Sequence, residues 1–256
     1  MDNEKDRRLT MLLVPFMSCS ARLPVYGLIS AAFFGAWAGA AVFALYILGM
    51  LMAIVSGIIF NKTVFAGLPA SFVIELPPYR VPLLKNTLIH VWIKIKGFLI
   101  RAGTVILVMS VVLWFLQSFD TSLKLVQDSA NSILAVIGGF IAPVFRPVGF
   151  GVWQAAVALL TGFVAKEAIV ASMSMFYGFS LTASGAVIAA ALAGFDPLSA
   201  FSFLVFVLLY VPCVAAVSTL YKETKSLKLT LMSVCWHIVV AYIISLLVYQ
   251  IGSLFV

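Results

Sequence analysis

The sequence contains little charge. Of its 256 residues, 16 are Lys or Arg, 9 are Asp or Glu and 2 are His, and charged side chains make up 10% of the total. Soluble domains carry about 25%. Together with 64% hydrophobic residues and a mean hydropathy of +1.17, this scarcity excludes a soluble globular class and predicts a polytopic membrane protein. The net charge of +7 indicates no nucleic-acid partner, because the basic residues fall in short clusters between apolar runs, as expected of cytoplasmic loops.

Cysteine is also scarce, and phosphate-binding motifs are absent. The three cysteines have no paired spacing, which excludes a disulfide framework and a zinc motif. No stretch matches G-x-x-x-x-G-K-[ST], so the chain cannot bind GTP through that loop. We therefore expect no permanently bound cofactor.

Apolar runs divide the chain. Met1–Arg8 is charged and precedes a long apolar stretch without a small-residue cleavage site, so we expect no removable signal peptide. Six runs are each long enough to cross a bilayer: Leu9–Phe34, Trp37–Phe60, Phe98–Phe119, Val152–Tyr177, Leu198–Leu220 and Leu229–Phe255. Ser132–Val148 is short, contains glycines and prolines, and fits a re-entrant or broken element. Leu181–Phe195 fits a short hairpin arm, and Asp196-Pro197 fits the start of the next helix. The predicted fold class is an all-α transmembrane bundle with proline-broken helices.

Basic residues predict the orientation. Clusters precede the first run, follow the second and precede the last, and all three belong in the cytoplasm, as does the N-terminus. The chain must then cross an additional time between Phe98–Phe119 and Leu198–Leu220. Either Ser132–Val148 crosses the membrane, or Val152–Tyr177 is itself a pair of half-helices.

The predicted cytoplasmic loop has two parts. Glu75–Pro82 contains three prolines and cannot be helical. Apolar residues then recur at helical spacing, with lysines outside their row: Leu84, Leu88, Trp92 and Ile95. This pattern favours an amphipathic helix on the membrane surface, although it is also compatible with an extension of Phe98–Phe119 into the cytoplasm.

The first polar segment, Phe16–Tyr26, places polar side chains inside an apolar run: Ser18, Cys19, Ser20 and Arg22. Pro15 and Pro24 bracket it. Within a helix they would leave the carbonyls of Met11 and Ser20 unpaired, and those oxygens would need another partner. A permeating cation is one such partner, and thiolate, hydroxyl and carbonyl ligands together suit a soft or borderline divalent metal.

The second polar segment, Thr161–Ser172, places Lys166 and Glu167 at mid-membrane depth, where ionisable residues are costly. Two interpretations stay open. An ion pair of Glu167 with Lys166 or Arg22 would only fix helix packing, whereas a carboxylate lining a cation path would be functional.

The third polar segment, Leu209–Ala216, repeats the proline-plus-cysteine design, because Pro212 would free the Leu208 carbonyl beside Cys213. Cys235 has no proline nearby and is interpreted as a packing residue. His237 is either a metal ligand or a satisfied polar residue.

Several motifs in order resemble the ferrous iron transport protein B family, FeoB: RLTMLLVPFMSCSARLPVY, ALYILGMLMA, ELPPYRVP, KGFLIRAG, GFVAKEAIV and LLYVPC. The resemblance implies a membrane transporter rather than an enzyme: a ferrous iron transporter of the bacterial inner membrane, with Cys19 and Cys213 lining the iron path. Thr161–Ser172 resembles the second of the family's two Gate elements, which nucleoside transporters share more distantly. The resemblance divides the chain into residues 1–60 (two transmembrane helices), 61–97 (loop and interfacial helix) and 98–256 (Gate-like domain).

Full members of this family also carry a G domain and a first Gate element, so we expect the chain to be the C-terminal half of a transporter. Its expected partners are the lipid bilayer and that N-terminal portion, and a homo-oligomer is compatible. In this interpretation Fe²⁺ is the transported substrate, ligated by Cys19, Cys213 and the hydroxyls of Ser18 and Ser20, while Glu167 offsets its charge. Arg22 and Lys166 would balance charge or gate the path. The alternatives are a Gate-domain permease for a nucleoside or other small solute and a non-transporting scaffold.

Overall fold

The computed structural model describes residues 4–65, 83–120, 124–125, 132–166, 168–178, 185–192, 195–210 and 213–254. Within these ranges the chain is helical and forms no strand, only an isolated bridge between Phe119 and Leu125, which confirms the all-α class. Three features singled out from the sequence lie outside the described residues: Glu167, Pro212 and Glu75–Pro82.

The first predicted span is a broken helix. α1 (Glu4–Leu13) passes into a 3-10 turn, η1 (Val14–Phe16), and a second 3-10 turn, η2 (Ser20–Arg22), leads into α2 (Leu23–Phe34). Pro15 lies in η1, at the break. Pro24 was expected to interrupt a helix and to free the Ser20 carbonyl, and this is wrong. Pro24 lies in the first turn of α2, where a missing N–H costs nothing, and the Leu23 N–H donates to the Ser20 carbonyl.

The predicted span Val152–Tyr177 is not one helix but a hairpin of two half-helices, the second of the two alternatives above. α6 (Trp153–Val164) and α7 (Ala168–Tyr177) have 12 and 10 residues, or about 18 and 15 Å at 1.5 Å per residue, too short for a core of about 30 Å. They run antiparallel, because the Trp153 ring at the start of α6 contacts the Phe176 ring at the end of α7, with centroids 5.2 Å apart. The tip of the hairpin contains Ala165 and Lys166.

Ser132–Val148 is a broken element, as expected. It forms α5 (Ile133–Ile141) and a 3-10 segment, η5 (Ala142–Val148), and Ile133–Val148 is bent by 103° relative to α6. The Ser132 hydroxyl caps α5 by accepting from the Ala135 N–H at 3.1 Å.

The third predicted break also exists. α9 (Pro197–Leu209) ends where Tyr210 turns to extended backbone, and α10 (Val214–Thr224) begins after Cys213. Asp196 occupies the N-cap position of α9 with Pro197 in its first turn, as predicted, although the Asp196 side chain makes no capping hydrogen bond. Short α8 (Gly185–Ala191) packs on α2.

Three long helices complete the fold: α3 (Ala38–Thr63), α4 (Leu84–Ser118) and α11 (Leu227–Gly252). The predicted interfacial segment and the predicted span Phe98–Phe119 form one continuous helix, α4, of 35 residues. Among the described residues, three helical stretches are long and apolar enough to cross a membrane: Lys5–Thr63, Pro197–Thr224 and Leu227–Gly252.

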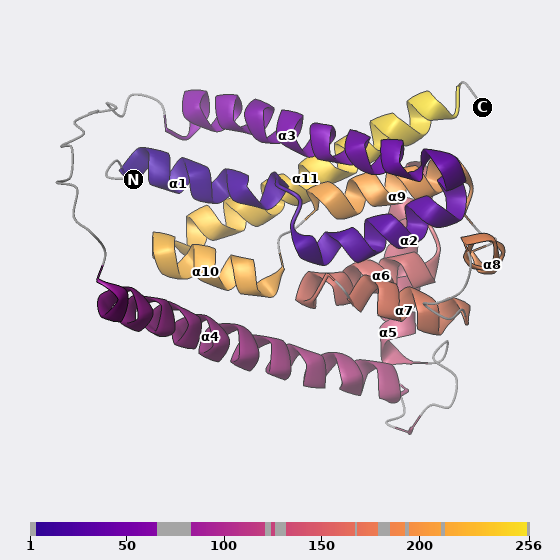
Figure 1. Cartoon of the computed structure of the whole chain (residues 1–256). Helices are drawn as coiled ribbons and strands as arrows, with labels where there is room; N and C mark the ends of the chain where they lie inside the picture. Colours follow the sequence, from indigo (N-terminus) through magenta and orange to yellow (C-terminus); the bar gives the residue numbers. More distant parts are fainter. Residues whose placement is uncertain are drawn as a thin grey trace.

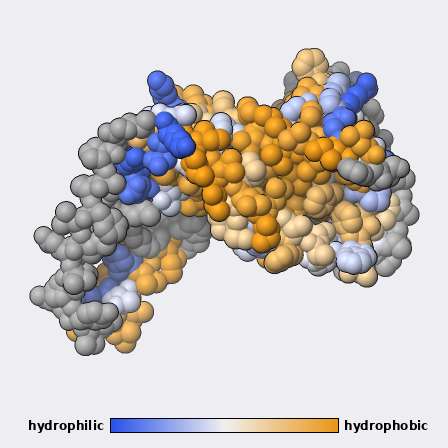
Figure 2. All heavy atoms as spheres, turned by 90° about the horizontal axis from the view of Figure 1, so that it is seen from above, coloured by the Kyte–Doolittle hydropathy of each residue, from blue (hydrophilic) through white to orange (hydrophobic). Residues whose placement is uncertain are grey.

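The basic ends of these elements gather at one side. Figure 1 places the N-terminus, the end of α3, the start of α4 and the turn between α10 and α11 together, opposite the turn between α2 and α3. A broad apolar face lies between two hydrophilic ends (Figure 2). Large apolar side chains of α3 are exposed, including Phe43 (67%) and Ile54 (60%), as expected of a surface in contact with lipid.

Two adjacent glycines of α5 provide a matched test of this packing. A Cβ at Gly138 would lie 2.9 Å from the Trp153 carbonyl oxygen and would collide with Val157 Cγ2, whereas a Cβ at Gly139 meets nothing within 4 Å. Both replacements by alanine improve helix propensity by about 1 kcal/mol. We therefore expect Gly139→Ala to keep or raise the Tm in detergent, and Gly138→Ala to lower it because overpacking costs about 1 to 3 kcal/mol. Equal Tm values for the two variants would contradict the α5–α6 packing.

Candidate functional site

Side chains from all three polar segments meet where their helices break. The electrostatic neighbours of the Lys166 ammonium are the Arg22 guanidinium and the thiols of Cys213 and Cys19. Cys19 lies on extended backbone between η1 and η2, and Cys213 lies at the break before α10. The fold therefore collects two thiols, two cations and irregular backbone from segments almost 200 residues apart in sequence.

Arg22 holds the first break together. Its side chain is 1% exposed, and its guanidinium donates from Nη1 to the Met17 carbonyl oxygen (3.0 Å) and from Nη2 to the Pro15 carbonyl oxygen (3.1 Å). The remaining donor, Nε, is buried and has no hydrogen-bond partner among the described residues. The Arg22 guanidinium thus binds the carbonyl oxygens of Pro15 and Met17. The sequence had predicted free carbonyls in this segment that would be available to a permeating ion.

Lys166 is buried as well, at 3% exposure. Its ammonium lies over the Tyr210 ring, with Nζ 3.6 Å from the ring centroid, in a cation–π contact. This contact links the tip of the α6–α7 hairpin to the end of α9.

The three cysteines differ in position. Cys19 is exposed, Cys213 is half-buried, and Cys235 is exposed on α11, a continuous helix. Ser18 has a buried hydroxyl, and Ser20 is exposed. Within the described ranges, no three His, Cys, Asp or Glu side chains cluster closely enough to hold a metal ion.

Two buried residues, Tyr26 and His237, lie beside this site. The sequence assigned no role to Tyr26 and left His237 as either a metal ligand or a satisfied polar residue. Both are 0% exposed. The Tyr26 hydroxyl lies beside the Ser18 hydroxyl, and both oxygen atoms are buried. Tyr26 follows Arg22 by one helical turn, a spacing from which its position could have been recognised.

His237 stacks on Phe16, with ring centroids 4.3 Å apart. Its Nδ1 lies 2.7 Å from the Ser233 carbonyl oxygen, which can only accept, so Nδ1 carries the proton and the neutral ring keeps its lone pair on Nε2. Nε2 is buried and has no hydrogen-bond partner in the described part of the chain. The sequence placed His237 near the start of the last apolar run, and the structure places it within α11 (Leu227–Gly252).

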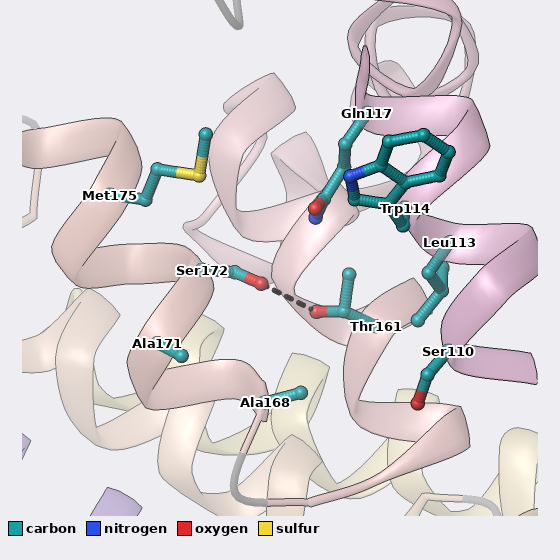
Figure 3. Close-up of a pocket in the computed structure, with 9 residues that line it drawn as sticks. All are labelled: Ser110, Leu113, Trp114, Gln117, Thr161, Ala168, Ala171, Ser172 and Met175. Carbon is teal, nitrogen blue, oxygen red and sulfur yellow. Dashed lines mark hydrogen bonds between the residues drawn. The ribbon is translucent and has the colours of Figure 1, made fainter. Parts of the chain in front are cut away.

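A pocket of about 230 Å³ adjoins the hairpin on the side of α4. Figure 3 shows its polar side chains: Ser110 and Gln117 from α4, and Thr161 and Ser172 from α6 and α7. Thr161 Oγ1 donates to the Ala158 carbonyl oxygen at 3.0 Å, so its 3.0 Å hydrogen bond with Ser172 Oγ is donated by Ser172. This bond joins the two half-helices a few residues from their tip.

Broken helices and a hairpin of half-helices that meet inside an apolar bundle define a class of protein: a multi-pass membrane protein. Comparison with protein families agrees with this class. The profile of the ferrous iron transport protein B C terminus matches residues 42–94, and that of Gate, described as nucleoside recognition, matches residues 99–227. The chain belongs to the FeoB family and corresponds to its C-terminal membrane region.

Relatives align along the whole chain. The Fe(2+) transporter FeoB of Staphylococcus aureus (strain COL) is 42% identical over 256 residues, which are 100% of this chain and 38% of that protein. The protein of the same name from Methanocaldococcus jannaschii is 37% identical, covering 99% of the chain and 38% of the relative, and that from Salmonella typhi is 33% identical, covering 99% and 39%. The chain thus spans less than two fifths of the length of these relatives. No solved structure matches it.

Proposed function

We propose that the chain forms the membrane part of an Fe²⁺ transporter and that the ion passes where the three helix breaks meet. The observation that carries this proposal is that the thiols of Cys19 and Cys213, from two different helix breaks, are both electrostatic neighbours of the Lys166 ammonium. The transport named for the relatives supports the choice of ion.

The chemistry of these groups suits ferrous iron. Fe²⁺ is a borderline cation that accepts thiolate, hydroxyl and carbonyl ligands. Cys19 and Cys213 supply sulfur, and Ser18 and Ser20 supply hydroxyl oxygen. In our proposal Glu167 adds a negative charge. A path with few ligands at each position binds the ion weakly enough to release it, as conduction requires. Iron is the substrate here, and no resident cofactor is needed.

The fold also supports a membrane topology. Five crossings, by α1 with α2, α3, α4, α9 with α10, and α11, bring every basic cluster to the same side, in agreement with Figure 1. The elements α5 to α8 then enter and leave from the opposite side without a net crossing. The positive-inside rule predicts that the basic side is cytoplasmic, and we therefore propose a cytoplasmic N-terminus. We also propose the bacterial inner membrane as the location, as the family resemblance implies. An N-terminal portion with a G domain and a first Gate element would complete the transporter.

Protection of thiols by metal tests the proposal. We would prepare membrane vesicles of three variants that each retain one cysteine, label them with N-ethylmaleimide under anaerobic conditions, and keep iron ferrous with ascorbate. Fe²⁺ is expected to slow the labelling of Cys19 and of Cys213 and to leave Cys235 unaffected, whereas Mg²⁺ protects none of them because it disfavours sulfur ligands. Labelling of Cys19 and Cys213 at rates that Fe²⁺ does not change would refute the metal path.

One observation favours a second candidate, a permease for a nucleoside or other small solute. The Gate profile is described as nucleoside recognition, and the pocket beside α4 offers Trp114 for stacking and the Gln117 amide for hydrogen bonds. In that case a nucleoside, and not Fe²⁺, would quench Trp114 fluorescence.

A further inference from the structure

The contact between Lys166 and Tyr210 joins the hairpin tip to a broken helix, and the thiols of Cys19 and Cys213 are electrostatic neighbours of the same ammonium. Lys166 lies between the end of α6 and the start of α7, where Ala165 has extended backbone. Tyr210 is the first residue beyond α9, with extended backbone as well. The 3.6 Å contact between Nζ and the ring centroid therefore connects two points at which helical hydrogen bonding stops.

Tyr210 is held rigidly enough to receive a cation on its face. Its hydroxyl donates to the Leu159 carbonyl oxygen at 3.3 Å, and its ring stacks on Phe206 with centroids 5.6 Å apart. Gly162 lies so close that a Cβ there would be 2.6 Å from the Tyr210 hydroxyl oxygen. The side chain is 5% exposed, so the ring has little room to rotate away.

The two cations near the thiols are anchored differently. Arg22 is bound to two backbone carbonyls of its own segment and is fixed by them. The Lys166 ammonium sits at the end of a four-carbon side chain and lies on the ring of Tyr210, a residue from a distant segment, and Lys166 itself lies at the turn between the half-helices α6 and α7. A divalent ion bound by Cys19 and Cys213 would be repelled by the Lys166 ammonium, because both thiols lie within its electrostatic range.

We propose that the Lys166 ammonium, held on the face of Tyr210, is a tethered cation that keeps the ion path closed until the hairpin tip moves away. Tyr210 is a positioning residue in this account: it binds Lys166, and Lys166 excludes the transported ion. This inference rests on the proposed ion path between Cys19 and Cys213.

The experiment measures how quickly reagents reach Cys213. In membranes of a chain whose only cysteine is Cys213, obtained with Cys19→Ser and Cys235→Ser, a cationic and an anionic methanethiosulfonate reagent of similar size are compared. Tyr210→Leu removes the ring and is expected to speed both reactions by about tenfold or more, because the tip is released. Tyr210→Phe keeps the ring, loses only the bond to Leu159, and should react nearly as slowly as the parent.

Two Lys166 variants form a second pair. They test the same proposal if the Tyr210→Leu protein fails to accumulate in the membrane. Lys166→Met is expected to speed the cationic reagent more than the anionic one, whereas Lys166→Arg, which can still stack on the ring, stays slow. Equal rates in Tyr210→Leu and Tyr210→Phe, or in Lys166→Met and Lys166→Arg, would overturn the proposal. A failure of the metal path itself would appear separately, as a lack of Fe²⁺ protection of Cys213 in the parent.

Discussion

Replacement of Arg22 by methionine is expected to destabilise the protein by about 3 to 5 kcal/mol, because it deletes a buried cation together with its hydrogen bonds. Methionine keeps much of the side-chain volume, but the carbonyl oxygens of Pro15 and Met17 lose their donors at 3.1 and 3.0 Å. Inside a bilayer no water replaces those donors, and the broken segment between α1 and α2 loses the bonds that fix its shape. The measurements are the amount of protein in the membrane and its Tm in detergent.

Lys222→Met is the matched control. Lys222 is a basic residue in the last turn of α10, and its side chain is exposed. The same loss of one positive charge should change the Tm little there, because exposed charges contribute about 0 to 1 kcal/mol. If Arg22→Met accumulates and unfolds like Lys222→Met, Arg22 does not support the break, and the geometry of the first polar segment is wrong.

The predictable part of the fold follows from strong local signals. Low charge and long apolar runs predicted the all-α membrane class, and proline marked the break at Pro15 because it cannot continue a helical ladder. Asp196-Pro197 marked the start of α9, because aspartate favours the N-cap position and proline favours the first turn of a helix. The FeoB resemblance, carried by motifs in order, is confirmed by the family comparisons.

The α6–α7 hairpin could not be chosen from composition. Val152–Tyr177 has the same hydropathy whether it crosses the membrane once or turns back at its centre. Only the charged pair at its middle indicated a special site, and such a pair is compatible with either arrangement. Similarly, lysines in the first half of α4 suggested a separate surface helix, although helix propensity continues through them without interruption.

Contacts distant in sequence decide the details of the candidate site. The sequence predicted that Arg22 balances charge or gates the path, but it did not predict that the Arg22 guanidinium donates hydrogen bonds to the carbonyls of Pro15 and Met17. Tyr210 precedes Pro212 by two residues, which predicted the end of a helix and not the cation that its ring binds. These contacts depend on how the three broken helices pack, which no local pattern specifies.

The initial rate of Fe²⁺ uptake by three single variants tests the central claim most directly. The chain would be assembled with its N-terminal portion, expressed at matched levels in cells that lack other ferrous transporters. Cys19→Ser and Cys213→Ser replace a sulfur ligand by a hard hydroxyl at the convergent breaks, and each is expected to lower uptake by about tenfold or more. Cys235→Ser changes an exposed thiol on the continuous helix α11 and should leave uptake near the parent rate. Equal tolerance of all three substitutions would contradict the account and return the cysteines to a packing role.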